Sequence, residues 1–130
     1  MQYQIADSAM LAKCQELLDN SGYYSAIQLS DIGGMVVVGV ADEKPVACVW
    51  VCLTGTRAYV DYLVADPAHK GAGVRLLVKG IALLRRMGVR EIKFDVHQDN
   101  EEVFRIAAVM GGEYCGYHAK YSIPIGESSG

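Results

Sequence analysis

The stretch DPAHKGAGVR, residues 66–75, lies between a segment that reads as a buried strand and one that reads as an amphipathic helix. The first N–H groups of a helix have no partner within it, so a loop at this place can present several of them to an anion. Gly71 and Gly73 let the backbone approach a ligand closely, and Lys70 and Arg75 add positive charge at the rim. The stretch therefore predicts a phosphate-binding loop, although a Gly-x-Gly pair is equally typical of a simple tight turn.

The segments on either side of this loop predict a strand–helix–strand unit. Residues 57–64 and 91–96 read as strands, and residues 74–87 carry apolar side chains at helical spacing, with Gly88 as the stop. Because such a crossover is right-handed and joins parallel strands, we expect these two strands to be parallel.

Two further strands precede this unit. Residues 35–40 and 46–53 are rich in Val and are separated by the polar loop ADEKP, which predicts an antiparallel hairpin. With the strand at 57–64 they form a three-stranded meander.

The first thirty residues predict a short strand and a helix. Residues 3–5 are the strand, and Asp7 caps a helix that runs from about residue 9 to residue 18. Residues 22–31 stay ambiguous, with a short second helix through Ala26 and Leu29 as one interpretation.

The last thirty residues predict a helix followed by closing strands. Asp99 or Asn100 begins the helix, which ends near Met110, and residues 113–117 and 119–123 read as strands. The element order predicts an α/β (α+β) fold with a mixed, mostly antiparallel central sheet of six to seven strands flanked by helices.

Length and composition predict one globular domain. The chain has 130 residues, of which 52% are hydrophobic and 21% charged, a balance that supports a single core. We expect residues 1–125 to form this domain and residues 126–130, which are small and polar, to be a disordered tail.

Charge and hydropathy exclude several function classes. The formal net charge is −3, and basic residues are scattered except at Arg85, Arg86 and Arg90, so we expect no nucleic-acid partner. We find neither a secretory signal pattern nor an apolar run of about 20 residues, which predicts a cytoplasmic protein without a membrane partner.

Cysteine spacing predicts no metal or redox site. Cys14, Cys48, Cys52 and Cys115 lack the C-x-x-C pattern and read as buried free thiols. The nearness of Cys115 to His118 keeps thiol catalysis as a remote alternative.

Two phosphate motifs do not fit residues 66–75. The dinucleotide fingerprint needs a third Gly where Leu76 stands, and the P-loop needs Gly-Lys-Ser/Thr. The remaining pattern, Lys70-Gly71-Ala72-Gly73-Val74-Arg75, resembles the acetyl-CoA signature of the GNAT family of N-acetyltransferases, a basic or Gln residue followed by x-x-Gly-x-Gly/Ala. The element order is similar to that family over nearly the whole chain.

The resemblance implies acetyl-CoA as co-substrate, without a metal. The amides of residues 70–75 would hold its pyrophosphate, and the backbone of Leu63, Val64 and Ala65 would pair with its pantetheine arm. Asn100 corresponds to an Asn in the family's second motif. Arg75 departs from the pattern, because it occupies the last small-residue place, where it would crowd the cofactor or reach a phosphate while its amide stays available.

The resemblance also implies direct transfer that needs a base and an acid. Asp61 occupies the place of the family's usual base, although it is equally well a polar residue on the solvent side of a strand; His97 and His118 are weaker alternatives. Ala107 stands where the family's Tyr acid is expected. Tyr114, Tyr117 and Tyr121, in the closing strands, are the substitutes, and packing is their alternative role.

These features predict an N-acetyltransferase that acts on a primary amine of a small molecule, peptide or protein. The alternative is a degenerate module that binds CoA or a protein partner without turnover, which Ala107 and Arg75 favour. Acetylation of a charged tRNA would need a basic face that the sequence does not indicate. A homodimer is an expectation by analogy with the family.

Overall fold

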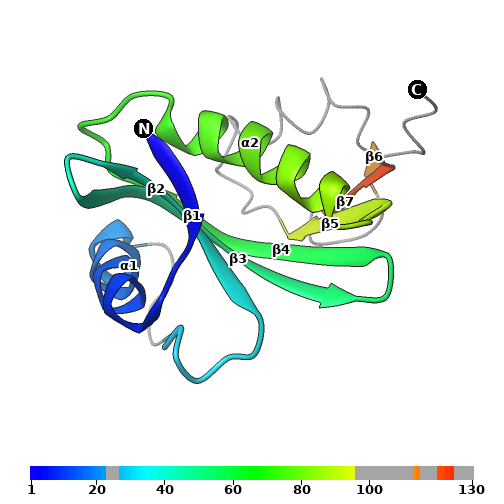
Figure 1. Ribbon diagram of the computed structural model, residues 1–130, viewed down its shortest axis with the longest axis horizontal. Helices are drawn as coiled ribbons and strands as arrows, with labels where there is room; N and C mark the ends of the chain where they lie inside the picture. The colour runs from blue at the N-terminus through cyan, green and yellow to red at the C-terminus, as the bar shows by residue number, and fades with distance from the viewer. Residues whose placement is uncertain (23–26, 96–112, 115–119, 125–130) are drawn as a thin grey trace.

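The computed structural model describes residues 1–22, 27–95, 113–114 and 120–124, and within them one mixed sheet separates two helices (Figure 1). The strand order is β1-β2-β3-β4-β5-β7-β6. All neighbours are antiparallel except β4 and β5, which are parallel as predicted from the crossover between them. The predicted mixed, mostly antiparallel sheet is therefore confirmed. The elements are β1 (Gln2–Ile5), α1 (Ser8–Ser21), β2 (Met35–Ala41), β3 (Lys44–Thr54), β4 (Arg57–Ala65), α2 (Ala72–Arg86), β5 (Glu91–Asp95), β6 (Glu113–Tyr114) and β7 (Lys120–Pro124).

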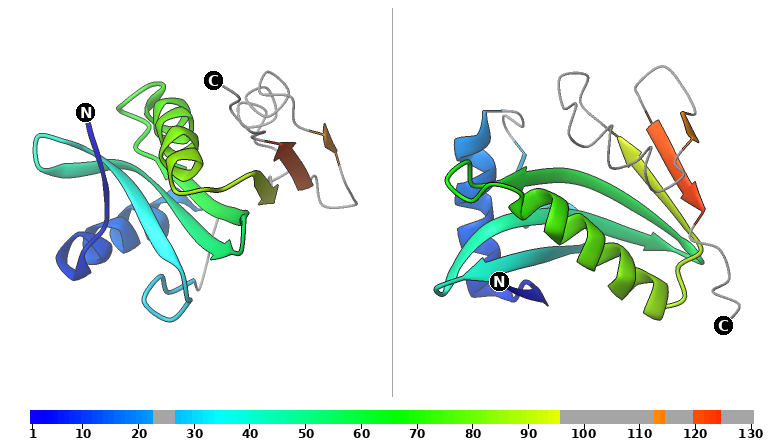
Figure 2. Two further views of the ribbon diagram at one scale, coloured as in Figure 1. Left: turned by 45° about the vertical axis from the view of Figure 1, so that its right-hand side comes forward. Right: turned by 90° about the horizontal axis from the view of Figure 1, so that it is seen from above.

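The first helix covers one face of the sheet (Figure 2). Its start is fixed as predicted, because the Asp7 carboxylate accepts the Met10 N–H at 2.8 Å. The helix continues to Ser21, one turn beyond the predicted end, and Gly22 closes it in the left-handed region with φ of 76°. On this face Cys14 and Leu18 pack into a cluster of buried side chains from the sheet and the following loop: Leu29, Val36, Val38, Cys48 and Val64.

The second helix covers the opposite face. Successive strand residues point to opposite faces of the sheet. Val36 and Val38 therefore lie in the buried cluster that includes α1 side chains, whereas Val37 lies in the buried cluster that includes α2 side chains, called here the α2 cluster. There Leu76 and Ile81 are buried among side chains of β2, β3 and β4. No polar or charged side chain is buried in the described part of the chain, so apolar packing holds both layers.

Several expectations fall outside the described residues. They include the last helix at about residues 100–110, Cys115 and the tail 126–130. The suggested second helix is partly outside as well, and Leu29, which is described, lies in a turn rather than in a helix. The described cysteines are free thiols: Cys14 and Cys48 are buried, and Cys52 is half-buried. Neither described helix is long and apolar enough to cross a membrane.

Candidate active site

The loop between β4 and α2 is built by two linked turns. The N–H of Asp66 donates to the Val46 carbonyl at 2.8 Å, which ties the loop to β3. The Asp66 side chain accepts the Ala68 N–H at 2.9 Å, and its carbonyl accepts the His69 N–H at 2.9 Å. The His69 carbonyl then accepts the Ala72 N–H at 3.1 Å. These bonds turn the chain from the end of β4 into the first turn of α2.

Four backbone amides at the start of α2 have no hydrogen-bond partner among the described residues. Gly71 is the N-cap of the helix and no side chain caps it. The amides of Lys70, Gly71, Gly73 and Val74 make no bond within the described part of the chain. Free N–H groups and the positive end of a helix dipole together form an anion site.

This arrangement corrects the expectation that all six amides from residue 70 to residue 75 are available. The Ala72 N–H closes the second turn, and the Arg75 N–H donates to the Gly71 carbonyl at 3.0 Å as the first bond of the helix. The side chain of Arg75 is exposed in the first turn of α2.

The two glycines of the loop are needed for different reasons. Gly71 has a φ of 78°, in the left-handed region that other residues rarely adopt, and a Cβ there would meet nothing within 4 Å. A Cβ on Gly73 would lie 3.4 Å from the Ala65 Cβ. Gly73 therefore lets the start of α2 come close to the end of β4.

Within the described residues, the strand that leads into this loop has an edge with no neighbouring strand, called here the open edge. β4 pairs with β5 only from Arg57 to Val60, and beyond Val60 no described strand continues this pairing. Figure 2 shows the two strands diverging. Because the Asp66 N–H points to β3 and backbone groups alternate along a strand, the Ala65 N–H points to the open edge. Leu63, Val64 and Ala65, predicted to meet the pantetheine arm, lie along this edge.

A bulge bends β4 beside the open edge. Cys48 pairs with Val64 and Trp50 pairs with Asp61, so two residues of β4 face one of β3. Tyr62, within the bulge, has a φ of 54°, a conformation that non-glycine residues rarely adopt.

Asp61 lies at this bulge. Its Oδ1 accepts the N–H of Tyr62 at 2.7 Å, and the residue is half-buried. Val60 belongs to the α2 cluster, so alternation places Asp61 on the α1 face of the sheet. The bond to Tyr62 stabilises the left-handed backbone, so the side chain has a structural role whatever its part in catalysis.

The second group of predicted catalytic residues is only partly described. Tyr114 lies in β6, and two strands, β5 and β7, separate it from β4. Strands lie about 4.8 Å apart, which places the Tyr114 backbone roughly 14 Å from β4 across the sheet. The structure therefore does not bring Tyr114 beside Asp61. Outside the described residues lie Asn100, Ala107, Tyr117, His97 and His118.

Sequence reasoning missed two positioning residues. Asp66 was read only as part of the loop, although an Asp-Pro pair is a typical turn signal. Trp50 donates through Nε1 to the Gly33 carbonyl at 2.6 Å and lies with its ring 5.7 Å from that of Tyr62. Nothing in the sequence indicated that Trp50 would pack beside the bulge.

Comparisons with known proteins agree with this geometry. The model of the acetyltransferase (GNAT) family matches residues 4–111. The ribosomal-protein-S18-alanine N-acetyltransferase of Escherichia coli has a similar structure, with a TM-score of 0.78, 16% identity and coverage of 98% of this chain and 97% of that one. Tetrahymena Gcn5 gives a TM-score of 0.77 at 11% identity, with 97% of each chain covered.

A third similar structure contains the cofactor. The PaiA N-acetyltransferase of Thermoplasma acidophilum, in complex with coenzyme A, gives a TM-score of 0.66 at 16% identity, with 94% of this chain and 97% of that one covered. At these identities the structures establish the fold alone, and no curated protein matches the chain. The family model spans most of the sequence, and the chain belongs to the acetyltransferase (GNAT) family.

Proposed function

We propose that this protein transfers an acetyl group from acetyl-CoA to a primary amine. The observation that carries the proposal is the set of four amides at the start of α2 that have no partner among the described residues, placed directly after a part of β4 that no described strand pairs with on its β5 side. A diphosphate needs several N–H donors in one place, and an extended amide-containing arm needs an unpaired strand edge. Family membership supports the same co-substrate.

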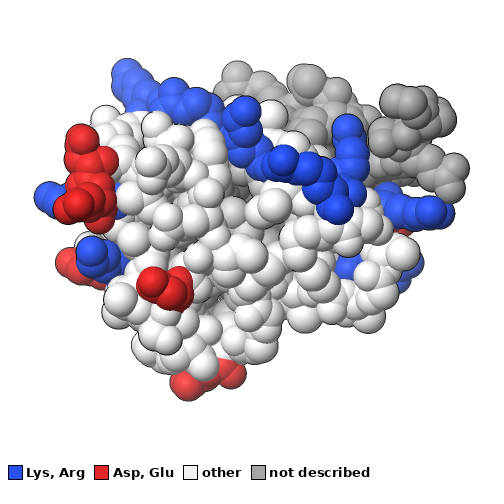
Figure 3. Space-filling view, in the orientation of Figure 1, with Lys and Arg blue, Asp and Glu red and all other residues white. Residues whose placement is uncertain are grey.

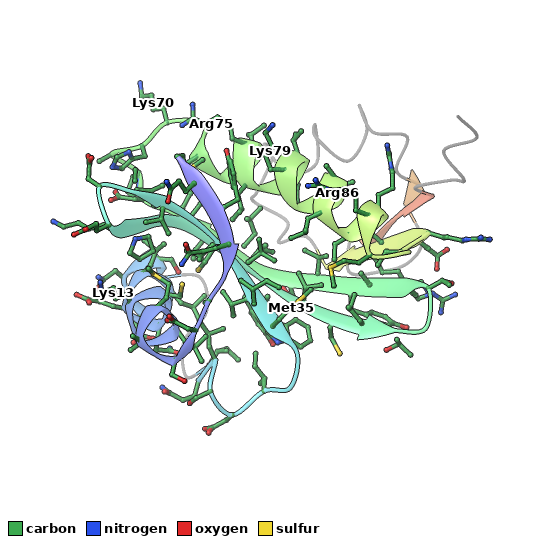
Figure 4. All side chains as sticks on the ribbon, viewed as in Figure 1. Lys13, Met35, Lys70, Arg75, Lys79 and Arg86 are labelled. Atoms are coloured by element: carbon green, nitrogen blue, oxygen red, sulfur yellow. The ribbon has the colours of Figure 1, made fainter. Side chains whose placement is uncertain are left out.

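The loop would hold the diphosphate of the co-substrate. The amides of Lys70, Gly71, Gly73 and Val74 would donate to its oxygens, and such bonds to a charged acceptor are about twice as strong as neutral ones. The exposed side chains of Lys70 and Arg75 lie at the same end of α2 and add positive charge (Figure 4).

The open edge of β4 would direct the thioester towards Asp61. The pantetheine arm would bond to the backbone of residues 63–65. This segment begins two residues after Asp61 on the same strand. The amine nitrogen then attacks the thioester carbon, the new C–N bond forms, and the C–S bond breaks to release a thiolate. The amine loses a proton and the thiolate gains one, with no covalent intermediate on the protein.

Asp61 is our proposed proton acceptor. Its Oδ1 accepts the Tyr62 N–H, and a carboxylate can take a proton from an amine directly or through one water molecule. Tyr117 and Tyr114 are the proposed donors to the thiolate, although Tyr114 lies on the far side of β5 and β7. The overall charge of −3 favours a cationic acceptor.

Thermal unfolding in the presence of acetyl-CoA, CoA and ATP tests the binding step. At a concentration one hundred times Kd, a ligand that binds only the folded state adds about 2.7 kcal/mol. We expect both CoA compounds to raise the Tm and ATP to leave it unchanged. Equal shifts with all three, or no shift, would contradict the proposal.

Thiol release measured on a panel of amines tests turnover separately. A protein that binds CoA and releases no thiol above the uncatalysed rate would be a binding module. The bond between Asp61 and Tyr62 is the observation that favours this second function, because it gives the carboxylate a purely structural reason to be present.

A further inference from the structure

The exposed side of α2 carries a row of cations. Arg75, Lys79, Ala82 and Arg86 are spaced 4, 3 and 4 residues apart, which places them along one side of the helix. Lys70 continues the row before the helix begins (Figure 4). We call Lys70, Arg75, Lys79 and Arg86 the basic stripe. The space-filling view in the same orientation shows a band of Lys and Arg side chains over α2 (Figure 3).

Within the described part of the chain, no acidic side chain pairs with the basic stripe. The α2 sequence, AGVRLLVKGIALLRR, contains no acidic residue. None of the four side chains forms an ion pair or a hydrogen bond with another described residue. The basic residues are separated in the sequence, and they become neighbours only on one side of the folded helix.

The stripe extends well past the proposed acetyl-CoA site. A helix rises 1.5 Å per residue, so Lys79 lies about 6 Å and Arg86 about 16 Å beyond Arg75. The favourable field of a helix start acts only within its first turn. A diphosphate bound at Gly71 and Gly73 would therefore lie too far from Arg86 to pair with it, so this end of the basic stripe is available to another ligand.

Aliphatic side chains lie among the cations. Val78 is 48% exposed and Met87 is 47% exposed, and Ala82, between Lys79 and Arg86, is exposed as well. Exposed aliphatic groups beside Arg and Lys are suited to a partner that offers both carboxylates and apolar contacts.

Other polyanions fit this surface less well. Nucleic-acid-binding domains are usually basic, whereas this chain has a net charge of −3, and α2 contains no aromatic residue on which a base could stack. A helix that lies in a membrane surface inserts its apolar face. In α2 that face, which includes Leu76 and Ile81, is buried against the sheet.

We propose that the exposed side of α2 is a docking surface for an acidic amphipathic helix of a partner protein. Carboxylates spaced one turn apart would pair with Lys79 and Arg86, and aliphatic side chains would contact Val78 and Ala82. This surface does not depend on acetyl transfer, because neither Lys79 nor Arg86 belongs to the proposed co-substrate loop.

Fluorescence anisotropy with a labelled synthetic peptide tests the proposal. The peptide is a helix of about 18 residues, long enough to be partly formed alone, with Glu along one side and Leu along the other. We expect it to bind, and a scrambled peptide of the same composition to bind at least about tenfold more weakly, a difference of about 1.4 kcal/mol. A single-stranded RNA and vesicles containing phosphatidylserine are the competing probes.

Matched charge reversals locate the binding surface. Lys79→Glu with Arg86→Glu should weaken peptide binding at least about tenfold. The control is Lys13→Glu with Lys44→Glu, which makes the same change in net charge at α1 and the β2–β3 hairpin. Its peptide affinity should stay within a factor of about two of wild type. Equal Tm values for the two variants serve as the folding check.

Four results would each overturn the proposal: no binding of the designed peptide, equal binding of the scrambled one, tighter binding of RNA or vesicles, or equal losses in the two variants. The measurement uses no acetyl-CoA, so its failure leaves the proposed transferase activity untouched.

Discussion

Two glycine-containing loops in this protein use glycine in opposite ways. Gly34, in the loop before β2, has a φ of 103°, and a Cβ there would lie 2.5 Å from the Val51 carbonyl oxygen and 3.0 Å from Trp50 Nε1. Gly71, before α2, has a similar left-handed φ of 78°, yet a Cβ there would meet nothing within 4 Å. The first loop is filled by the protein itself, whereas the second opens to solvent beside unpaired amides.

The difference separates structural loops from loops that can receive a ligand. A glycine surrounded closely by other groups of the protein, such as Gly34, allows the loop to pack tightly and leaves no space for a ligand. A glycine with a positive φ and empty surroundings is also typical of ordinary turns and helix ends, such as Gly55 and Gly22 in this chain. What marks the loop at Gly71 is the group of backbone amides there that have no hydrogen-bond partner among the described residues. The amide of Gly71 and those of Lys70, Gly73 and Val74 have no partner within the described part of the chain.

Gly34→Ala should be the most damaging change. The new Cβ both clashes with the Val51 carbonyl and forces a left-handed conformation, so we expect the free energy of unfolding to fall by about 3 kcal/mol. Urea denaturation measures this loss. Gly33→Ala is the control, because Gly33 has no left-handed φ and open surroundings, and its effect should be within about 0.5 kcal/mol. Similar losses at the two positions would show that the crowding is not real.

Asp61→Asn tests whether Asp61, which lies in β4 between the two loops in the sequence, is structural or catalytic. Asn keeps a side-chain oxygen that can accept the Tyr62 N–H, so stability should stay close to wild type. Because Asn cannot accept the proton, the variant should release thiol about 100-fold more slowly, and its rate should rise less steeply with pH. Asp61→Ala, which removes the oxygen as well, should lower both the rate and the Tm. An unchanged pH–rate profile in the Asn variant would leave Asp61 with only its structural role.

The architecture was predictable because its signals are local. Runs of Val at 35–40, helical spacing at 74–87 and Asp7 as a cap each fix an element from neighbouring residues. The left-handed Tyr62 was not predictable, because the bulge arises from the register of β4 against β3. The separation of Tyr114 from β4 likewise depends on strand order across the whole sheet.

The candidate site shows the same division. Gly-x-Gly at 71–73 predicted the loop, because glycine adopts backbone conformations that other residues rarely reach. Which amides stay free depends on the turns that Asp66 and His69 close, and those bonds have no sequence signature of their own. The basic stripe was missed for a related reason, because Arg75, Lys79 and Arg86 become neighbours only on the helix surface.

Gly71→Ala should separate a cost in stability from a cost in binding. A left-handed Ala costs about 1–2 kcal/mol, and relief of that strain would move the amides that follow. We expect a small fall in Tm together with roughly tenfold weaker binding of acetyl-CoA by calorimetry.

Gly55→Ala is the matched control for this change. Gly55 has a φ of 62° and open surroundings like Gly71, but it lies in the turn between β3 and β4. The stability cost should be the same and the affinity unchanged. If both variants lose affinity equally, the loop at Gly71 is not the co-substrate site.

Trp50→Phe should have the smallest effect and tests how the closed loop is held. Phe removes the Nε1 donor to the Gly33 carbonyl and keeps an aromatic ring near Tyr62, so we expect a loss of about 1 kcal/mol. Because the Gly34 Cβ would approach Trp50 Nε1 as well as Val51, removing the indole should relieve part of the Gly34→Ala clash. The double variant should therefore lose less than the sum of the single losses, by at least about 0.5 kcal/mol. Additive losses would mean that Trp50 and Gly34 act independently and that the carbonyl of Val51 alone closes this loop.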